Sequence, residues 1–285
     1  MNMLIEVDEL AERLGEQSLR LIDTRFSLQD VDLGKRQYRD GHISGAVYAD
    51  LERDLSGAVT PGVTGRHPLP DPAQFAERLQ SWGINETTQV VVYDAGNHSM
   101  AARCWWLLEW AGLSRVRVLH GGLKAWVDAG FPVGQGGASC DPGNYTFTPR
   151  NQRTVTTNDV LTLLSQHQSA ALLDARDLER YAGRSEPIDP VAGHIPGAVC
   201  VPFVDNMDSH NRFLPPDVLT DRFGRFYPTA DAGEDLRPAC YCGSGVTACH
   251  NILAMRLAGL PWPTLYPGSW SEWITDPARP VATGD

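Results

Sequence analysis

Basic residues are scarce in this chain of 285 residues, which has 24 Lys and Arg against 35 Asp and Glu and a formal net charge of -11. Nucleic acids and anionic membranes bind to basic surfaces, so this balance argues against both as partners. Long apolar runs are also missing, and no stretch approaches the roughly 20 residues of a membrane span. Acidic residues interrupt the apolar N-terminal segment, so we expect an amphipathic helix there and not a signal peptide.

Cysteine is sparse too, with six residues scattered at positions 104, 140, 200, 240, 242 and 249. A chain of this length does not need disulfides for stability, so we expect reduced thiols and a cytoplasmic location. The spacing of Cys240 and Cys242 could suggest a metal site, but no second pair of Cys or His completes one. The sequence therefore predicts no metal site, and nothing in it indicates an organic cofactor.

Cys242 follows a short apolar run at 239–241 and precedes a loop, 243–247, that has the sequence Gly-Ser-Gly-Val-Thr. Glycine tolerates positive φ and leaves room for backbone N–H groups to turn inward. A helical pattern follows, and its start adds free N–H donors and a partial positive charge. Such surroundings lower the pKa of a thiol from about 8.5 and would also hold a persulfide anion. The stretch predicts a small anion-binding loop around one reactive sulfur.

A phosphate-binding loop of the pattern Cys-x5-Arg would be a different use of the same position. Here Ala248 stands six residues after Cys242, and no arginine follows before Arg256. Without an arginine to clamp the phosphate oxygens, phosphatase chemistry is disfavoured.

One sequence pattern occurs twice, about 150 residues apart, which indicates a duplicated domain. Within each copy short apolar runs alternate with helical stretches, as in a parallel sheet flanked by helices. We therefore expect an α/β protein of two tandem domains, each a mostly parallel sheet flanked by helices. The repeated motifs are 21–25 and 172–176, 41–46 and 193–198, and 119–126 and 266–273. The expected strands are 18–22, 47–48, 89–93 and 116–119, then 170–174, 199–202, 238–241 and 264–266.

Two pairs of residues in these repeats have expected structural roles. Arg25 and Arg176 each stand two residues after an aspartate at a strand end, and we expect both to form ion pairs with it. His42 and His194 lie in the same Gly-His-Ile-x-Gly-Ala turn. For His194 we expect a ring hydrogen bond that holds the turn.

The sequence Cys-Gly-Ser-Gly-Val-Thr at 242–247 resembles the active-site loop of the mercaptopyruvate sulfurtransferases, a branch of the rhodanese family. The thiosulfate-using branch usually carries basic residues directly after its cysteine, where this chain has Gly243 and Ser244. Asp94 stands at the cysteine position of the first copy, in a loop expected to be one residue longer. The resemblance implies an inactive N-terminal rhodanese-like domain at 1–135, a linker at 136–153 and a catalytic rhodanese domain at 154–285.

The resemblance also implies roles for individual residues. Cys242 would carry the persulfide, and Ser244, His42 and Asp32 would form a proton relay, with Asp30 as the alternate carboxylate. Arg180 would hold the substrate carboxylate. Many mercaptopyruvate enzymes have a second arginine after a Glu-Pro-x pattern, where this chain has Asp189, so Arg184 is the candidate substitute. The loop residues expected to bind the persulfide are Gly243, Gly245, Val246 and Thr247.

The reaction implied is sulfur transfer from 3-mercaptopyruvate through a Cys242 persulfide to cyanide, a thiol or reduced thioredoxin, with release of pyruvate. The expected partners are thus a small anionic sulfur donor and one of these acceptors. Two alternatives stay open. Transfer from thiosulfate to cyanide would reward positive charge beside the cysteine, which the neutral residues Gly243 and Ser244 do not supply. A sulfur-carrier or docking module is the other alternative, and the intact cysteine loop argues against it.

Overall fold

The computed structural model describes residues 3–138, 140–165, 171–227 and 237–284. By contacts within the chain it divides into two compact units. The first contains Met1–Gly57, Leu69–Arg150 and His210–Arg212, and the second contains Ala58–Pro68, Asn151–Ser209 and Phe213–Asp285. Each unit thus includes a short segment from the other half of the chain. The domain boundaries predicted from the sequence leave both of these segments in their own half of the chain, because apolar periodicity does not reveal where a stretch of coil packs.

A five-stranded parallel sheet with the order β1-β5-β4-β2-β3 forms the first unit. Its strands are β1 (Leu4–Ile5), β2 (Leu19–Asp23), β3 (Ala46–Tyr48), β4 (Gln89–Tyr93) and β5 (Val116–Leu119). The central strand, β4, has three consecutive valines, as is common where helices cover both faces of a sheet. Leu21 of β2 is in register with Val91 of β4. The sequence predicts the other four strands but not β1, which has only two residues.

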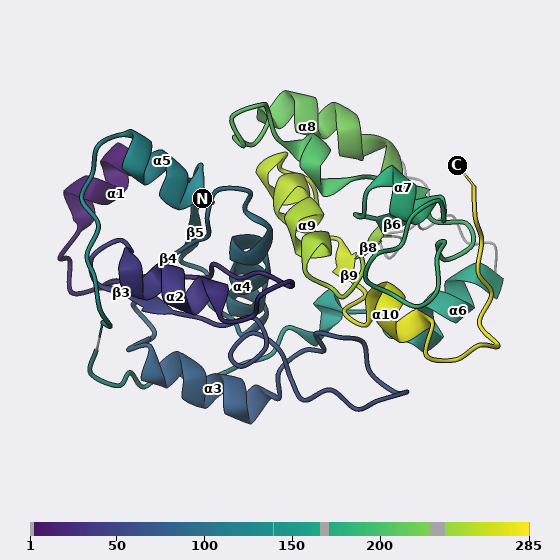
Figure 1. Cartoon of the computed structure of the whole chain (residues 1–285), viewed down its shortest axis with the longest axis horizontal. Helices are drawn as coiled ribbons and strands as arrows, with labels where there is room; N and C mark the ends of the chain where they lie inside the picture. The colour runs from purple at the N-terminus through teal and green to yellow at the C-terminus, as the bar shows by residue number, and fades with distance from the viewer. Residues whose placement is uncertain (1–2, 139, 166–170, 228–236, 285) are drawn as a thin grey trace. The chain divides into compact units, whose positions relative to one another are not determined.

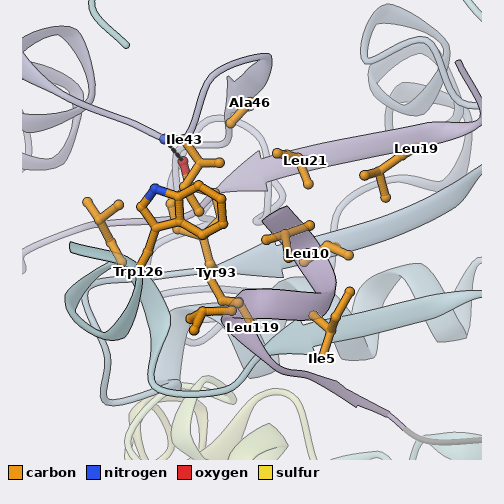
Figure 2. Packing of buried hydrophobic residues seen from close by; sticks show 12 residues of the cluster. Ile5, Leu10, Leu19, Leu21, Ile43, Ala46, Tyr93, Leu119 and Trp126 are labelled. Atoms are coloured by element: carbon orange, nitrogen blue, oxygen red, sulfur yellow. Dashed lines mark hydrogen bonds between the residues drawn. The ribbon is translucent and has the colours of Figure 1, made fainter. Parts of the chain in front are cut away.

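Helices α1 and α5 cover one face of this sheet, and their side chains share one apolar cluster with it (Figure 2). Leu10 of α1 and Trp126 of α5 pack in this cluster, where Tyr93 of β4 also lies. The Tyr93 hydroxyl accepts a hydrogen bond of 3.1 Å from the Ile43 N–H. Helix α4 packs against β4 and β5. The helices of this unit are α1 (Val7–Arg13), α2 (Leu33–Asp40), α3 (Pro72–Ser81), α4 (Ser99–Trp110) and α5 (Gly122–Asp128).

The second unit repeats the design with a four-stranded parallel sheet of order β7-β6-β8-β9. Its strands are β6 (Leu172–Asp174), β7 (Val199–Cys200), β8 (Ala239–Tyr241) and β9 (Thr264–Leu265). Its helices are η1 (Asn151–Arg153), α6 (Thr157–Ser165), α7 (Leu178–Tyr181), η2 (Phe203–Asn206), α8 (Pro216–Phe223), η3 (Gly224–Phe226), α9 (Thr247–Leu257) and α10 (Ser269–Trp273) (Figure 1). Residue 170, the first of the strand expected at 170–174, lies outside the described residues.

The structure confirms the structural pairs expected from the repeat. Arg25 grips both carboxylate oxygens of Asp23, and its Nη2 donates to the Gly41 carbonyl at 2.7 Å. Arg176 does the same with Asp174 and with the Gly193 carbonyl. These buried pairs fix the strand end to the turn that follows, because one guanidinium bonds both.

Candidate functional site

Cys242 lies in the turn between β8 and α9, at the carboxyl end of the parallel sheet. The N–H of Cys242 donates to the Ser269 hydroxyl at 3.1 Å, and its carbonyl accepts from the Trp270 N–H at 3.0 Å. The loop is thus held at its base by the first turn of α10. At Gly245 the backbone φ is +74°, and a Cβ there would lie 2.5 Å from the Pro267 carbonyl oxygen. Glycine is therefore required at 245 by conformation and by space.

The surroundings of the Cys242 thiol favour its ionised form. The residue is only 2% exposed. Burial by itself raises the pKa, but donors from the Thr247 hydroxyl and the Ser244 and Ala248 N–H groups outweigh it, so the pKa lies below its ordinary value. At Cys200, by contrast, burial raises the pKa to about 12. The loop, and not burial, distinguishes Cys242 as a nucleophile.

The corresponding loop of the first unit surrounds a carboxylate instead of a thiol. Asp94 follows β4 as Cys242 follows β8. Its carboxylate accepts hydrogen bonds from the N–H groups of Gly96, His98, Met100 and Ala101, at 2.8 to 3.3 Å. Asp94 is thus a buried residue whose carboxylate caps the first turn of α4. A loop of this shape therefore stabilises one negative charge with several backbone donors.

The two loops also have the same length, so the expectation of an extra residue in the first is wrong. Helices α4 and α9 begin at Ser99 and Thr247, each five residues after Asp94 and Cys242 respectively. His98, with φ of 58°, adopts the left-handed conformation that glycine usually takes.

Ser244 has a histidine partner that the sequence analysis missed. The Oγ of Ser244 lies 2.8 Å from Nδ1 of His67, and both side chains are buried. His67 belongs to the segment 58–68, which packs in the second unit. The Arg66 N–H of that segment donates to the Ser271 hydroxyl of α10 at 3.0 Å. A sequence separation of 177 residues leaves no local pattern that could have predicted this pair.

His42 and Asp32, the two other members of the expected relay, have different contacts. Nδ1 of His42 lies 2.7 Å from the Tyr38 carbonyl, and its ring stacks on Tyr38. His194 makes the equivalent contacts with Tyr181. Asp32 precedes α2 and is largely exposed, 3.9 Å from Nη2 of Arg53. The shared geometry of the two histidines matches a role in holding the turn, and the relay role of His42 stays a prediction.

Two arginines lie over the residue after Cys242. A Cβ on Gly243 would be 2.9 Å from Nη2 of Arg66 and 3.4 Å from Nη2 of Arg180. Arg180 is not an isolated surface charge, because its Nη2 donates to Glu186 at 2.8 Å and to Asp189 at 3.1 Å. Arg184, the other expected cation, is 45% exposed and pairs with Glu179.

The residues that match a known family cover most of the chain. The description of that family is "Rhodanese-like domain", and it matches at residues 6–129 and 156–276. The chain belongs to the rhodanese family. Its two matched stretches correspond to the two sheets, one carrying the Asp94 loop and the other the Cys242 loop.

Several relatives align with nearly the full chain. A Pseudomonas aeruginosa protein named "Probable 3-mercaptopyruvate sulfurtransferase" is 52% identical over 285 residues, which cover 99% of this chain and 98% of that protein. A Mycobacterium tuberculosis protein named "Putative thiosulfate sulfurtransferase SseB" is 40% identical over 288 residues, covering 99% and 97%. The crystal structure of the Escherichia coli 3-mercaptopyruvate sulfurtransferase SseA has a TM-score of 0.81 at 31% identity and covers 95% of this chain and 100% of that one.

Two kinds of feature are absent from the part of this rhodanese chain that the structure describes. Within the described ranges, no helix is both long enough and apolar enough to cross a membrane. Over those same residues, no three His, Cys, Asp or Glu side chains are grouped so that they could hold a metal ion.

Proposed function

We propose that this protein transfers sulfur from 3-mercaptopyruvate through a persulfide on Cys242. The observation that carries the proposal is a thiol of lowered pKa in an anion-binding loop, next to a buried Ser–His pair and two arginines. The names of relatives aligned over nearly the whole chain support the same donor.

In the first step the Cys242 thiolate attacks the thiol sulfur of the donor. An S–S bond forms and the C–S bond breaks, and its electron pair leaves with the carbon as the enolate of pyruvate. The proton from the donor thiol returns to that carbon, so the products are pyruvate and the Cys242 persulfide anion. The N–H groups of the loop, which include those of Ser244 and Ala248, are placed to stabilise this anion without moving.

The proton has a path through Ser244 and His67. The Ser244 hydroxyl is two residues from Cys242 and is hydrogen-bonded to the His67 ring at 2.8 Å. A hydroxyl backed by an imidazole can pass a proton in either direction, since the ring nitrogen accepts and returns it. We assign the relay to this pair, with Ser244 as the group nearest the reacting carbon.

In the second step a nucleophilic acceptor removes the outer sulfur and restores the thiolate. Cyanide would form thiocyanate, and a thiol or reduced thioredoxin would form a new persulfide. None of the six cysteines, all of which the structure describes, forms a disulfide. That state fits the reducing cytoplasm, which we propose as the location. The first domain would have no sulfur chemistry of its own, because Asp94 fills the loop.

Thiosulfate is the second candidate donor, and one observation favours it. Arg66 and Arg180 give the loop the neighbouring positive charge that the neutral residues Gly243 and Ser244 do not. Thiosulfate transfer needs no proton at carbon, so it would not depend on the Ser–His pair.

Steady-state rates, measured at equal donor concentration with cyanide as acceptor, show which donor the protein prefers. We expect kcat/KM for pyruvate release from mercaptopyruvate to exceed kcat/KM for thiocyanate formation from thiosulfate by at least about tenfold. A larger value with thiosulfate would assign the protein to the other branch of the family.

A further inference from the structure

We infer that Arg66, which is paired with Asp189, is the main carboxylate-binding group for the donor. The inference rests on the proposed function for the identity of the donor, and on the geometry around Gly243 for the position of its anionic end.

Six charged side chains form a continuous row of ion pairs beside the loop. Arg176 lies between Asp174 and Glu186, and Arg180 lies between Glu186 and Asp189. Arg66 is the last residue of this row, and its Nη1 is bonded to the Oδ1 of Asp189. Both carboxylates after Asp174 are thus shared between two arginines. These ion pairs hold the guanidinium groups of Arg66 and Arg180 beside Gly243.

The three arginines use their guanidinium edges differently. Nε and Nη2 of Arg176 form a fork that grips Asp174, and the same fork of Arg180 grips Glu186. Arg66 bonds Asp189 through Nη1 instead. Its Nε is buried and, among the described residues, has no hydrogen-bond partner.

That fork of Arg66 lies at the loop. Its Nη2 is the atom nearest to a Cβ built on Gly243, at 2.9 Å, whereas Arg180 comes within 3.4 and 3.6 Å through Nη2 and Nη1. Burial lowers the pKa of Arg66, and the ionised Cys242 is the largest influence that raises it. The side chain is 27% exposed, which leaves access for a small ligand.

A fork of two donors is the geometry that fits a carboxylate. A buried N–H without a partner is costly, and a bound carboxylate oxygen would satisfy it. We therefore assign the donor carboxylate to the Nε and Nη2 atoms of Arg66, with Nη1 of Arg180 as a single further donor. Arg184 is paired with Glu179 on α7 and takes no part.

The assignment also gives a reason for glycine at 243. A side chain there would meet Arg66 first, so any larger residue would displace the fork from the sulfur. Arg66 and His67 are adjacent in the same segment, so one stretch of coil supplies both the carboxylate site and the relay base.

The test compares alkylation of Cys242 by iodoacetate, which carries a carboxylate, with alkylation by neutral iodoacetamide. Rates are followed at the Cys242 peptide by mass spectrometry. We expect Arg66→Gln to lower the ratio of the two rates by about tenfold, because a charge-assisted fork is lost. Arg66→Lys keeps the charge without the fork and should lose an intermediate amount. Arg36→Gln, at an exposed arginine paired with Asp30, is the matched control and should leave the ratio unchanged.

Because the readout is an alkylation ratio, it does not depend on which sulfur donor the protein uses. An unchanged ratio in Arg66→Gln would overturn the inference, and so would an equal fall in Arg184→Gln. Failure of the wild-type protein to release pyruvate from mercaptopyruvate would instead count against the proposed function alone. If both hold, Arg66→Gln should also raise KM for mercaptopyruvate about tenfold with less change in kcat.

Discussion

At the scale of single residues, the reactivity of Cys242 depends on a few donors. Its thiolate is held by the Thr247 hydroxyl and by two backbone N–H groups, which overcome the effect of burial on the pKa. Cys240 lies two residues earlier on β8, where burial raises the pKa of its thiol. The same chemical group is thus inert in the strand and nucleophilic in the loop.

This account predicts the pH dependence of alkylation by iodoacetamide. The thiolate fraction rises with pH and reaches one half at the pKa, so the rate at Cys242 should reach its midpoint below that of an ordinary cysteine. Thr247→Val keeps the shape and removes the hydroxyl donor, which should move the midpoint to higher pH. A midpoint that stays in place would show that the backbone N–H groups hold the thiolate without Thr247.

A second prediction concerns the relay histidine. His67→Ala should lower kcat with mercaptopyruvate by about 100-fold, the typical contribution of general acid–base catalysis. Thiosulfate turnover, which needs no proton at carbon, should change much less. Both donors are measured with each variant, and the selectivity between donors is the readout.

His42→Ala is the matched comparison for that experiment. Its ring hydrogen bond to the Tyr38 carbonyl is structural, so its loss should reduce the free energy of unfolding by about 1 kcal/mol without donor selectivity. If His42→Ala is selective and His67→Ala is not, the relay belongs to His42, as the family resemblance implied.

At the scale of elements, the strand–loop–helix unit β8–α9 is the part that sequence predicts best. Its chemistry is local: Cys242, two glycines and the start of α9 all lie within a few residues. The repeated Asp–Arg pairs were predictable for the same reason, since their partners stand two residues apart. Arg66 and His67 were not, because their contacts with Asp189 and Ser244 form only when a coil segment packs on the second sheet.

The loop itself makes a prediction at this scale. Gly245 and Gly259 share a φ of +74°, but a Cβ at 245 meets the Pro267 carbonyl oxygen while nothing lies within 4 Å at 259. Gly259→Ala should therefore cost about 1–2 kcal/mol of unfolding free energy, the cost of a left-handed backbone. Gly245→Ala should cost about 3 kcal/mol or more, because steric overlap adds to it.

Urea denaturation of both variants measures these free energies. Persulfide loading, measured under conditions where both variants are folded, should be lost only in Gly245→Ala. Equal costs for the two substitutions would mean that space beside Pro267 does not constrain the loop.

At the scale of the whole molecule, a duplicated fold has been put to two uses. Both domains keep a parallel sheet, a loop at its carboxyl edge and a helix whose N–H groups face that loop. In the first domain the loop binds its own aspartate, and in the second it surrounds a thiol. The fold was predictable as a whole, because the repeat and the alternation of strands and helices run through the sequence.

The net charge of -11 does not conflict with an anionic donor, because the local charges decide its binding. Three arginines and three carboxylates alternate in a row of ion pairs beside the Cys242 loop, and Arg66 is the last residue of that row. An acidic protein can thus present a cation at one point while its remaining surface stays negative.

The central claim is that Cys242 takes sulfur from 3-mercaptopyruvate as a persulfide. The most direct measurement is the intact mass of the reduced protein after a brief exposure to 3-mercaptopyruvate without acceptor, with pyruvate assayed in the same sample. The account predicts one added sulfur and one pyruvate per chain, and neither in Cys242→Ser. Pyruvate release without added sulfur, or sulfur added equally to Cys242→Ser, would contradict it.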